Sequence, residues 1–196
     1  MARRDAERGP ARRANLLVGE IGAEGDGVAT GEGGRVYVPY TAPGDAIIAD
    51  VRGERGALVS IERPGPDRVA ASCRHFGDCG GCALQHVSRP FQSAWKRDRV
   101  VAALAREGVE AEVRPTVELP VAARRRATFA VRKDGATRFG FNARTSARVV
   151  DIGECPVLDP ALEGRLPGLR ALAAALPGAN FDLAVTVCDN GLDISA

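Results

Sequence analysis

Lysine and long apolar runs are both scarce in this chain of 196 residues. Only two of its 27 basic residues are lysines, Lys96 and Lys133, and the arginine excess by itself identifies no function. No apolar run approaches the length that a membrane-spanning helix needs, so we expect no membrane partner. The start, MARRDAERGPARR, lacks the apolar core of a secretory signal. We therefore expect a cytoplasmic protein, where disulfides are rare and cysteine patterns indicate metal binding or catalysis.

Four of the five cysteines form a pattern. Three lie in the run Cys73-Arg-His-Phe-Gly-Asp-Cys79-Gly-Gly-Cys82, and the fourth is Cys155. A tight trio of thiols with one distant partner is typical of a metal or iron–sulfur site. The glycines of the run let the backbone approach such a centre, since no Cβ is in the way. Cys188 follows an apolar run and is expected to be a packed thiol; the alternative for the other four is unrelated buried thiols or two disulfides.

Charge is unevenly distributed along the chain. The net charge is only +2, yet residues 111–150 hold nine bases against three acids. Residues 14–72 hold five bases against nine acids, and residues 151–196 hold two against seven. A basic block of this kind is the electrostatic footprint of a nucleic-acid-binding surface. The alternative is a solvated strand face.

Short apolar runs separated by turns predict a small β-barrel before a boundary near residue 65. The glycine-rich segment 22–34 is predicted to be a turn and not a phosphate loop, because Thr30 breaks the G-x-G-x-x-G pattern. The expected barrel strands are Asn15–Ile21, Gly34–Pro39, Asp45–Val51 and Ala57–Ile61.

The rest of the chain predicts one amphipathic helix and a β-rich region. Ser88 can cap the helix, Pro90 fits its first turn, and Gly108 can end it. The expected strands cover 125–132, 137–141, 147–152, 181–187 and 192–194, with a helix over 161–176 and a hairpin turn at residues 134–135. The last hairpin is half built at the final residue, so we expect the sequence to be a fragment.

The cysteine run resembles the cluster loop of bacterial uracil-5 RNA methyltransferases, which modify 23S ribosomal or transfer RNA with S-adenosylmethionine. Segments on both sides also resemble that family, and the resemblance covers about residues 14–196. The matching segments are Glu24–Ala29, Val36–Pro39, Pro43–Asp45, Cys73–His86, Arg124–Ala127, Phe139–Phe141 and Val149–Val157.

The resemblance implies a mostly β, α+β fold. Residues 14–66 would be a TRAM domain (an OB-like five-stranded RNA-binding barrel), and 67–196 a central iron–sulfur domain that is incomplete at its C-terminal end. Residues 1–13 are polar and arginine-rich without periodicity, so we expect a disordered basic arm there. The methyltransferase domain, with its nucleophilic cysteine and S-adenosylmethionine pocket, would be absent. S-adenosylmethionine would then serve only the full-length parent enzyme, and this chain alone is expected to be inactive.

The resemblance also implies the site residues. Cys73, Cys79, Cys82 and Cys155 would hold one 4Fe–4S cluster. The RNA-contacting candidates are Arg124, Arg126, Arg132 and Lys133. Arg124 and Arg126 match the family's pattern, whereas Ala123 and Arg125 replace its aromatic and amide residues. We expect Arg124 and Arg126 to share one strand face.

Other aromatic residues leave their roles open. His75 and Phe76 beside the cysteines are expected to pack the loop, and Tyr37 and Tyr40 could stack on bases or fill the barrel. The partner would be RNA, and the chain a monomer. The rival hypotheses are a zinc-binding RNA module, a small electron carrier, and a stand-alone RNA-binding protein without catalysis.

Overall fold

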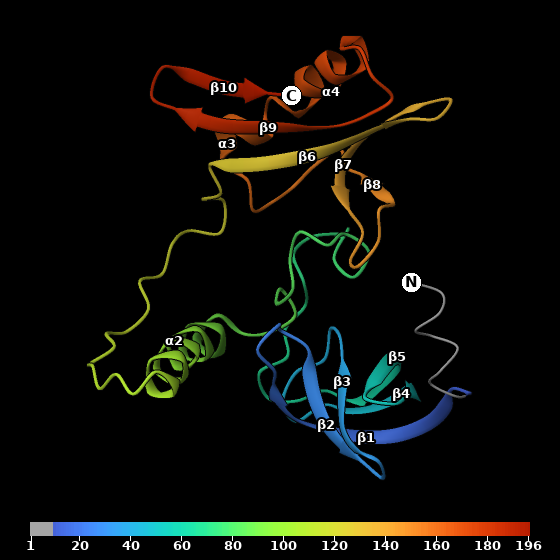
Figure 1. Cartoon of the computed structure of the whole chain (residues 1–196), viewed down its shortest axis with the longest axis vertical. Coiled ribbons are helices and arrows are strands. Elements are labelled where there is room, and N and C mark those ends of the chain that lie inside the picture. The colour runs from blue at the N-terminus through green and yellow to red at the C-terminus, as the bar shows by residue number, and fades with distance from the viewer. Residues whose placement is uncertain (1–9) are drawn as a thin grey trace. The chain divides into compact units, whose positions relative to one another are not determined.

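The structure, a computed structural model, describes residues 10–196 and divides into two compact units (Figure 1). The barrel unit comprises the chain up to Ala71 together with Ala83–Val117. The sheet unit comprises Ser72–Cys82 and Glu118–Ala196. The cysteine trio therefore belongs to the sheet unit, although the chain on both sides of it belongs to the barrel unit.

Five strands of the barrel unit form a closed barrel in the order β1-β2-β3-β5-β4. β1 pairs with both β2 and β4, which closes the barrel, and β3 pairs with β5 in parallel. The strands are β1 (Arg12–Ile21), β2 (Gly27–Gly31), β3 (Gly34–Val38), β4 (Ala46–Arg52) and β5 (Arg55–Arg63).

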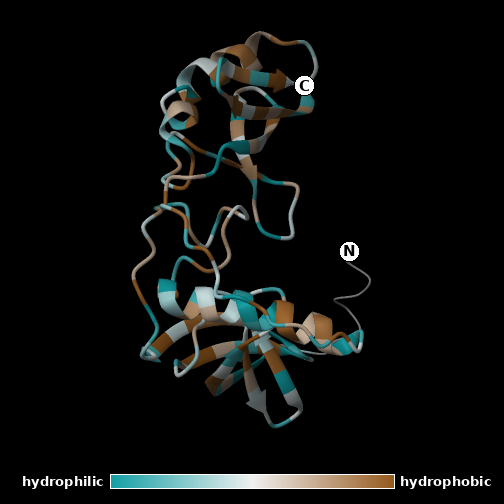
Figure 2. Cartoon of the chain, turned by 90° about the vertical axis from the view of Figure 1, so that its left-hand side faces the viewer, coloured by the Kyte–Doolittle hydropathy of each residue, from teal (hydrophilic) through white to brown (hydrophobic). Residues whose placement is uncertain are grey.

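Alternation of side chains explains why these segments form a barrel. In β4 the inward residues Ile47, Ala49 and Val51 are buried, while the residues between them are partly exposed. Apolar and polar residues also alternate in the barrel strands of Figure 2. Gly27 allows a close approach, because a Cβ there would lie 2.0 Å from Thr41 Oγ1. The predicted five-stranded barrel is confirmed.

Two local expectations for this unit differ from the structure. The segment 22–34 is not only a turn, because it contains β2, in which Val28 and Ala29 are buried. Arg12 and Arg13 do not belong to a disordered arm but begin β1, where Arg13 pairs with Asp50 at 2.9 Å. Residues 1–9 of the expected arm lie outside the described residues.

The predicted amphipathic helix is α2 (Arg89–Arg106). The Ser88 hydroxyl accepts a hydrogen bond from the Phe91 N–H, and Gly108 follows the helix with a φ of 69°. Phe91 and Trp95 pack against a small buried cluster of the barrel unit, and the Trp95 indole N–H donates to the Ile21 carbonyl at 3.1 Å. Contacts thus place α2 with the barrel, and the functional boundaries at 14–66 and 67–196 stay a prediction.

The sheet unit contains a five-stranded antiparallel sheet in the order β10-β9-β6-β7-β8. Two short helices cover one of its faces, so the expected helix over 161–176 is split in two. The elements are β6 (Arg126–Lys133), β7 (Thr137–Asn142), β8 (Val149–Asp151), α3 (Pro160–Glu163), α4 (Leu166–Ala175), β9 (Asn180–Cys188) and β10 (Gly191–Ser195).

The core of the sheet unit lies between this sheet and the helices. Phe129 and Phe139 are fully buried and their rings stack at 4.6 Å, with Leu162 and Leu169 from the helices in the same cluster. Gly135 turns the β6–β7 hairpin with a φ of 98°, as expected. Among the described residues, no helix has the length and apolar character to cross a membrane. The mostly β, α+β architecture is confirmed.

Candidate metal centre

The cysteine loop is a series of tight turns docked on the end of β7. The His75 carbonyl accepts a hydrogen bond from the Cys79 N–H at 2.8 Å, and the Gly80 N–H donates to the Asn142 carbonyl at 3.0 Å. A Cβ on Gly80 would lie 2.8 Å from that carbonyl oxygen, so the close approach requires glycine. Gly80 therefore allows the cysteine loop to dock on the end of β7.

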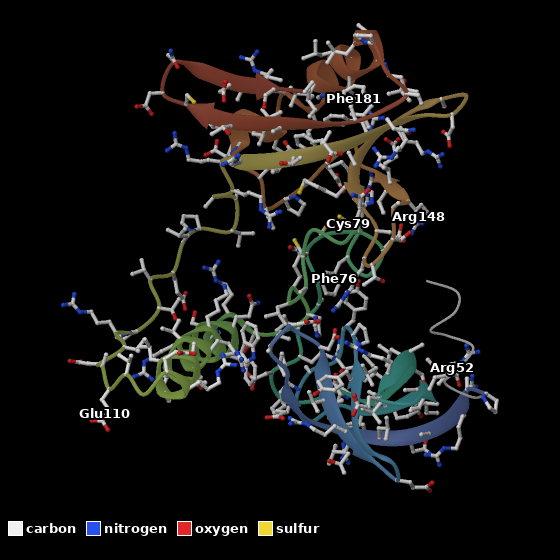
Figure 3. The ribbon with its side chains drawn as sticks, viewed as in Figure 1. Arg52, Phe76, Cys79, Glu110, Arg148 and Phe181 are labelled. Atoms are coloured by element: carbon white, nitrogen blue, oxygen red, sulfur yellow. The ribbon has the colours of Figure 1, made fainter. Side chains whose placement is uncertain are left out.

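Two ion pairs connect the loop with the segments around the fourth cysteine. Arg148, just before β8, pairs with Asp78 of the loop. Arg74 of the loop pairs with Glu154, the neighbour of Cys155, at 3.1 Å. Figure 3 labels Arg148 and Cys79 in the sheet unit. These four charged residues were not predicted from the sequence, although an arginine and an aspartate inside a cysteine loop are a signal for such pairing.

The Cys79 thiol lies in a partly buried, electrostatically crowded position. Burial raises the pKa of Cys79. The Gly81 N–H donates to the Cys79 Sγ at 3.4 Å and lowers this pKa. The charges of Cys82 and Cys73 raise it further, with a smaller contribution from Asp78. The net pKa is above that of an ordinary thiol, so the uncomplexed cysteine holds its proton. A bound cation would reverse this preference, because the thiolate is the ligand form.

The Cys155 thiol, in a remote segment, has surroundings similar to those of Cys79. Cys155 is buried, which raises its pKa, and the Val157 N–H lowers this pKa by hydrogen bonding. The charges of Cys82 and Cys73 raise the pKa, and the charge of the Arg124 guanidinium lowers it. The same two cysteines thus act on both Cys79 and Cys155. Cys73 and Cys82 therefore lie within electrostatic range of both Cys79 and Cys155.

All four of these thiols are free cysteines, and residues 10–196 contain no group of three or more His, Cys, Asp or Glu arranged to hold a metal ion. As a set of donors, four thiolates would suit a zinc ion or a 4Fe–4S cluster. Backbone N–H donors to two of the sulfurs also fit a cluster, whose sulfurs commonly accept such bonds.

The four predicted RNA-binding residues have different surroundings. β6 begins at Arg126, so Arg124 does not lie on the strand with it: Arg124 precedes β6, is half-buried, and donates to the Gly81 carbonyl at 3.3 Å. The reason is that the partner strand starts the pairing only at Arg126, opposite Thr186. Arg126 is exposed, as an RNA contact would need.

Arg132 and Lys133, at the other end of β6, are partly engaged within the protein. The Arg132 guanidinium donates to the Val131 carbonyl at 2.8 Å. The Lys133 ammonium donates to the Ala174 carbonyl at 3.0 Å and to Leu176. A cation that binds the last carbonyls of a helix stabilises that end, so Lys133 acts at least as a cap of α4.

The remaining candidates are partly buried. Phe76 and His75 are half-buried within the turns of the loop, and the Phe76 N–H donates to the Cys73 carbonyl at 3.1 Å, which fits loop packing. Tyr37 lies under the Arg55 guanidinium, 5.3 Å from the ring centre. Cys188 is half-buried at the end of β9, far along the sequence from the other four cysteines.

Comparisons with known proteins give a consistent set of relatives. No protein-family model matches the chain. The chain is 45% identical over 187 residues to an uncharacterized RNA methyltransferase of Caulobacter vibrioides, covering 92% of this chain and 45% of that protein. A similar protein of Brucella suis is 43% identical, with 92% and 44% covered. The 23S rRNA (uracil(1939)-C(5))-methyltransferase RlmD of Halomonas elongata is 37% identical, with 84% and 36% covered. The chain thus spans less than half the length of these relatives.

Proposed function

We propose, from the premise that this chain is related to the N-terminal part of bacterial RNA methyltransferases, that it recognises RNA and carries a 4Fe–4S cluster for such an enzyme. The whole protein would methylate C5 of a uridine in ribosomal or transfer RNA, with S-adenosylmethionine as the methyl donor. The whole protein would act in the cytoplasm, where these RNAs are. The observation that carries the proposal is the gathering of four thiols, from two remote segments, in one unit of a chain with these relatives.

Four thiolates can hold either a zinc ion or a 4Fe–4S cluster. We propose the cluster because the cysteine run resembles the cluster loop of the uracil-5 RNA methyltransferases, and because the backbone N–H donors to Cys79 and Cys155 suit cluster sulfurs. A cluster with four irons binds one cysteine per iron. When bound, it supplies iron–thiolate bonds that join the loop to the segment after β8.

The barrel supports an RNA-binding role. Its size, its closure and its strand order are those of a small OB-like barrel, the architecture that we propose for a TRAM domain. Barrels of this kind bind single strands with a cationic groove and with aromatic stacking platforms. Tyr37, with Arg55 over its ring, is a half-buried candidate for such a platform.

The sheet unit would supply the main cationic contact. Arg126 is the exposed member of the four predicted residues, at the start of β6 and within the basic block 111–150. Its guanidinium can bind a phosphate or stack on a base. Chemistry on a uracil requires the base to leave its stack, so the role of both units would be to hold the RNA around the exposed nucleotide.

A purification without oxygen tests the proposal. We expect the chain to contain about four irons with matching sulfide and to absorb broadly in the visible range, which zinc does not. Cys155→Ser should remove most of the iron and the colour, whereas Cys188→Ser should leave both unchanged. Zinc in place of iron, or equal loss from the two variants, would contradict the proposed cluster.

A further inference from the structure

We propose that Arg124 is a positioning residue of the thiol site: it ties the two cysteine-bearing segments together and offsets their negative charge. This inference rests on the proposed 4Fe–4S cluster. It gives Arg124 a different role from Arg126, with which the sequence pattern groups it.

The backbone of Arg124 is fixed to the segment that follows Cys155. Its N–H donates to the Val157 carbonyl at 3.0 Å, and its carbonyl accepts from the Asp159 N–H at 2.9 Å. These two bonds form an isolated parallel bridge with Leu158. The position of Arg124 is therefore set by the chain just beyond the fourth cysteine.

The side chain of Arg124 reaches the other cysteine-bearing segment. One of its Nη atoms donates to the carbonyl of Gly81, between Cys79 and Cys82, at 3.3 Å. A single residue thus connects the trio with the segment of Cys155, through its side chain on one side and its backbone on the other. Such an outer contact orients metal ligands before and after the metal binds.

The charge of Arg124 is available to the thiols. Arg74 and Arg148, which also contact these segments, are paired with carboxylates. The Arg124 contact is to a carbonyl, which leaves its charge uncompensated by that bond. Its charge also acts on Cys155. Four thiolates carry more negative charge than an iron–sulfide core neutralises, and a guanidinium stays protonated at any working pH. Half-burial reduces solvent screening of this interaction.

The experiment compares Arg124→Gln, which keeps a donor but not the charge, with Arg124→Lys, which keeps the charge but not the planar fork. Arg125→Gln is the matched control, because Arg125 donates to the Val187 carbonyl at 2.9 Å and lies beside Asp189. Each protein is purified without oxygen. The two measurements are the rate of iron loss to a chelator and the reduction potential of the cluster.

We expect Arg124→Gln to lose iron about tenfold faster, the lower end of outer-contact effects. Its reduction potential should become more negative, because reduction adds an electron where a positive charge has been removed. Arg124→Lys should also lose iron faster but keep a potential near that of the wild type, and Arg125→Gln should match the wild type in both measurements. A simple structural role would accelerate iron loss equally in both Arg124 variants without separating their potentials.

Three outcomes would overturn the inference. If Arg124→Gln retains iron like the wild type, Arg124 does not tie the segments. If Arg124→Gln and Arg124→Lys have the same potential, its charge does not reach the cluster. A wild-type protein without iron would instead overturn the proposed cluster itself, together with this inference, so the two failures are distinguishable.

Discussion

Replacing Asp45 by alanine should be among the most destabilising single changes in the barrel unit. This carboxylate is fully buried and accepts hydrogen bonds from the N–H groups of Ala42 at 2.6 Å and Gly65 at 2.8 Å, and from the Arg68 guanidinium at 2.7 Å. Asp45→Ala leaves two backbone donors and a largely buried cation without their acceptor. Removal of one partner from a buried ion pair costs about 3–5 kcal/mol, and we expect a loss in this range.

The assay uses the single tryptophan of the chain. Trp95 packs on the barrel through α2, so its fluorescence during urea unfolding reports the barrel unit. The control is Asp50→Ala, which breaks the exposed ion pair with Arg13 on the same barrel. Exposed pairs contribute about 0–1 kcal/mol, so the control should change the free energy of unfolding by no more than that.

The same carboxylate predicts a pH dependence. Burial alone would raise the pKa of Asp45, but the hydrogen bonds from Arg68, Ala42 and Gly65 together lower it below its ordinary value. A folded pKa below the unfolded value of about 3.9 gives stability that is fully present above pH 4 and is lost as the pH falls through the folded pKa. The advantage of the wild type over Asp45→Asn should therefore be constant near neutral pH and shrink in acid.

The reasoning fails if Asp45→Ala and Asp50→Ala unfold at the same urea concentration. It also fails if the difference between wild type and Asp45→Asn grows as the pH falls below 4. Either result would mean that the buried network around Asp45 is not a net source of stability for the barrel.

Three further predictions concern the sheet unit. Gly80→Ala should displace the cysteine loop and lower the iron content after purification, because the new Cβ would clash with the Asn142 carbonyl. Gly168→Ala should not, because a Cβ at that position would meet open space. Arg126→Ala should weaken RNA binding and lower the slope of log affinity against log salt by about 0.7, because one phosphate contact is lost. The control Arg125→Ala should leave the slope unchanged. Identical curves for the wild type and Arg126→Ala would show that Arg126 does not contact RNA. Phe129→Ala should cost about 3–5 kcal/mol in sheet-unit stability, measured by circular dichroism, and a loss below 1 kcal/mol would contradict its core position.

Local sequence patterns predicted most of the fold. Alternation marked four barrel strands, and the turn at Gly135 marked the β6–β7 hairpin. The strand β2 was missed because its two glycines and glycine-rich flanks hide the two-residue period. β6 starts one residue after the expected start at 125, because its start is fixed by pairing of Arg126 with Thr186, sixty residues later, which no local pattern contains.

The candidate site shows the same limit. The spacing of the cysteines predicted a common centre, and the ligand set stays a prediction. The partners that seat the loop come from far along the chain: Arg148 pairs with Asp78, and Arg124 reaches Gly81. These contacts depend on the register of the sheet unit, so sequence alone did not predict them, and the RNA contact of Arg124 stays a prediction.

The discontinuous make-up of the sheet unit has a consequence for protein synthesis. The loop with Cys73, Cys79 and Cys82 is translated before the sheet on which it docks, and 72 residues lie between Cys82 and Cys155. At about 5–20 residues per second, the ribosome takes roughly 4–15 s to make that interval. For most of this time Asn142, on which the loop docks, has not been made, and Cys155 follows it only at the end of the interval. Delivery of the proposed cluster to the finished protein would therefore require the three thiols to stay reduced until Cys155 has emerged.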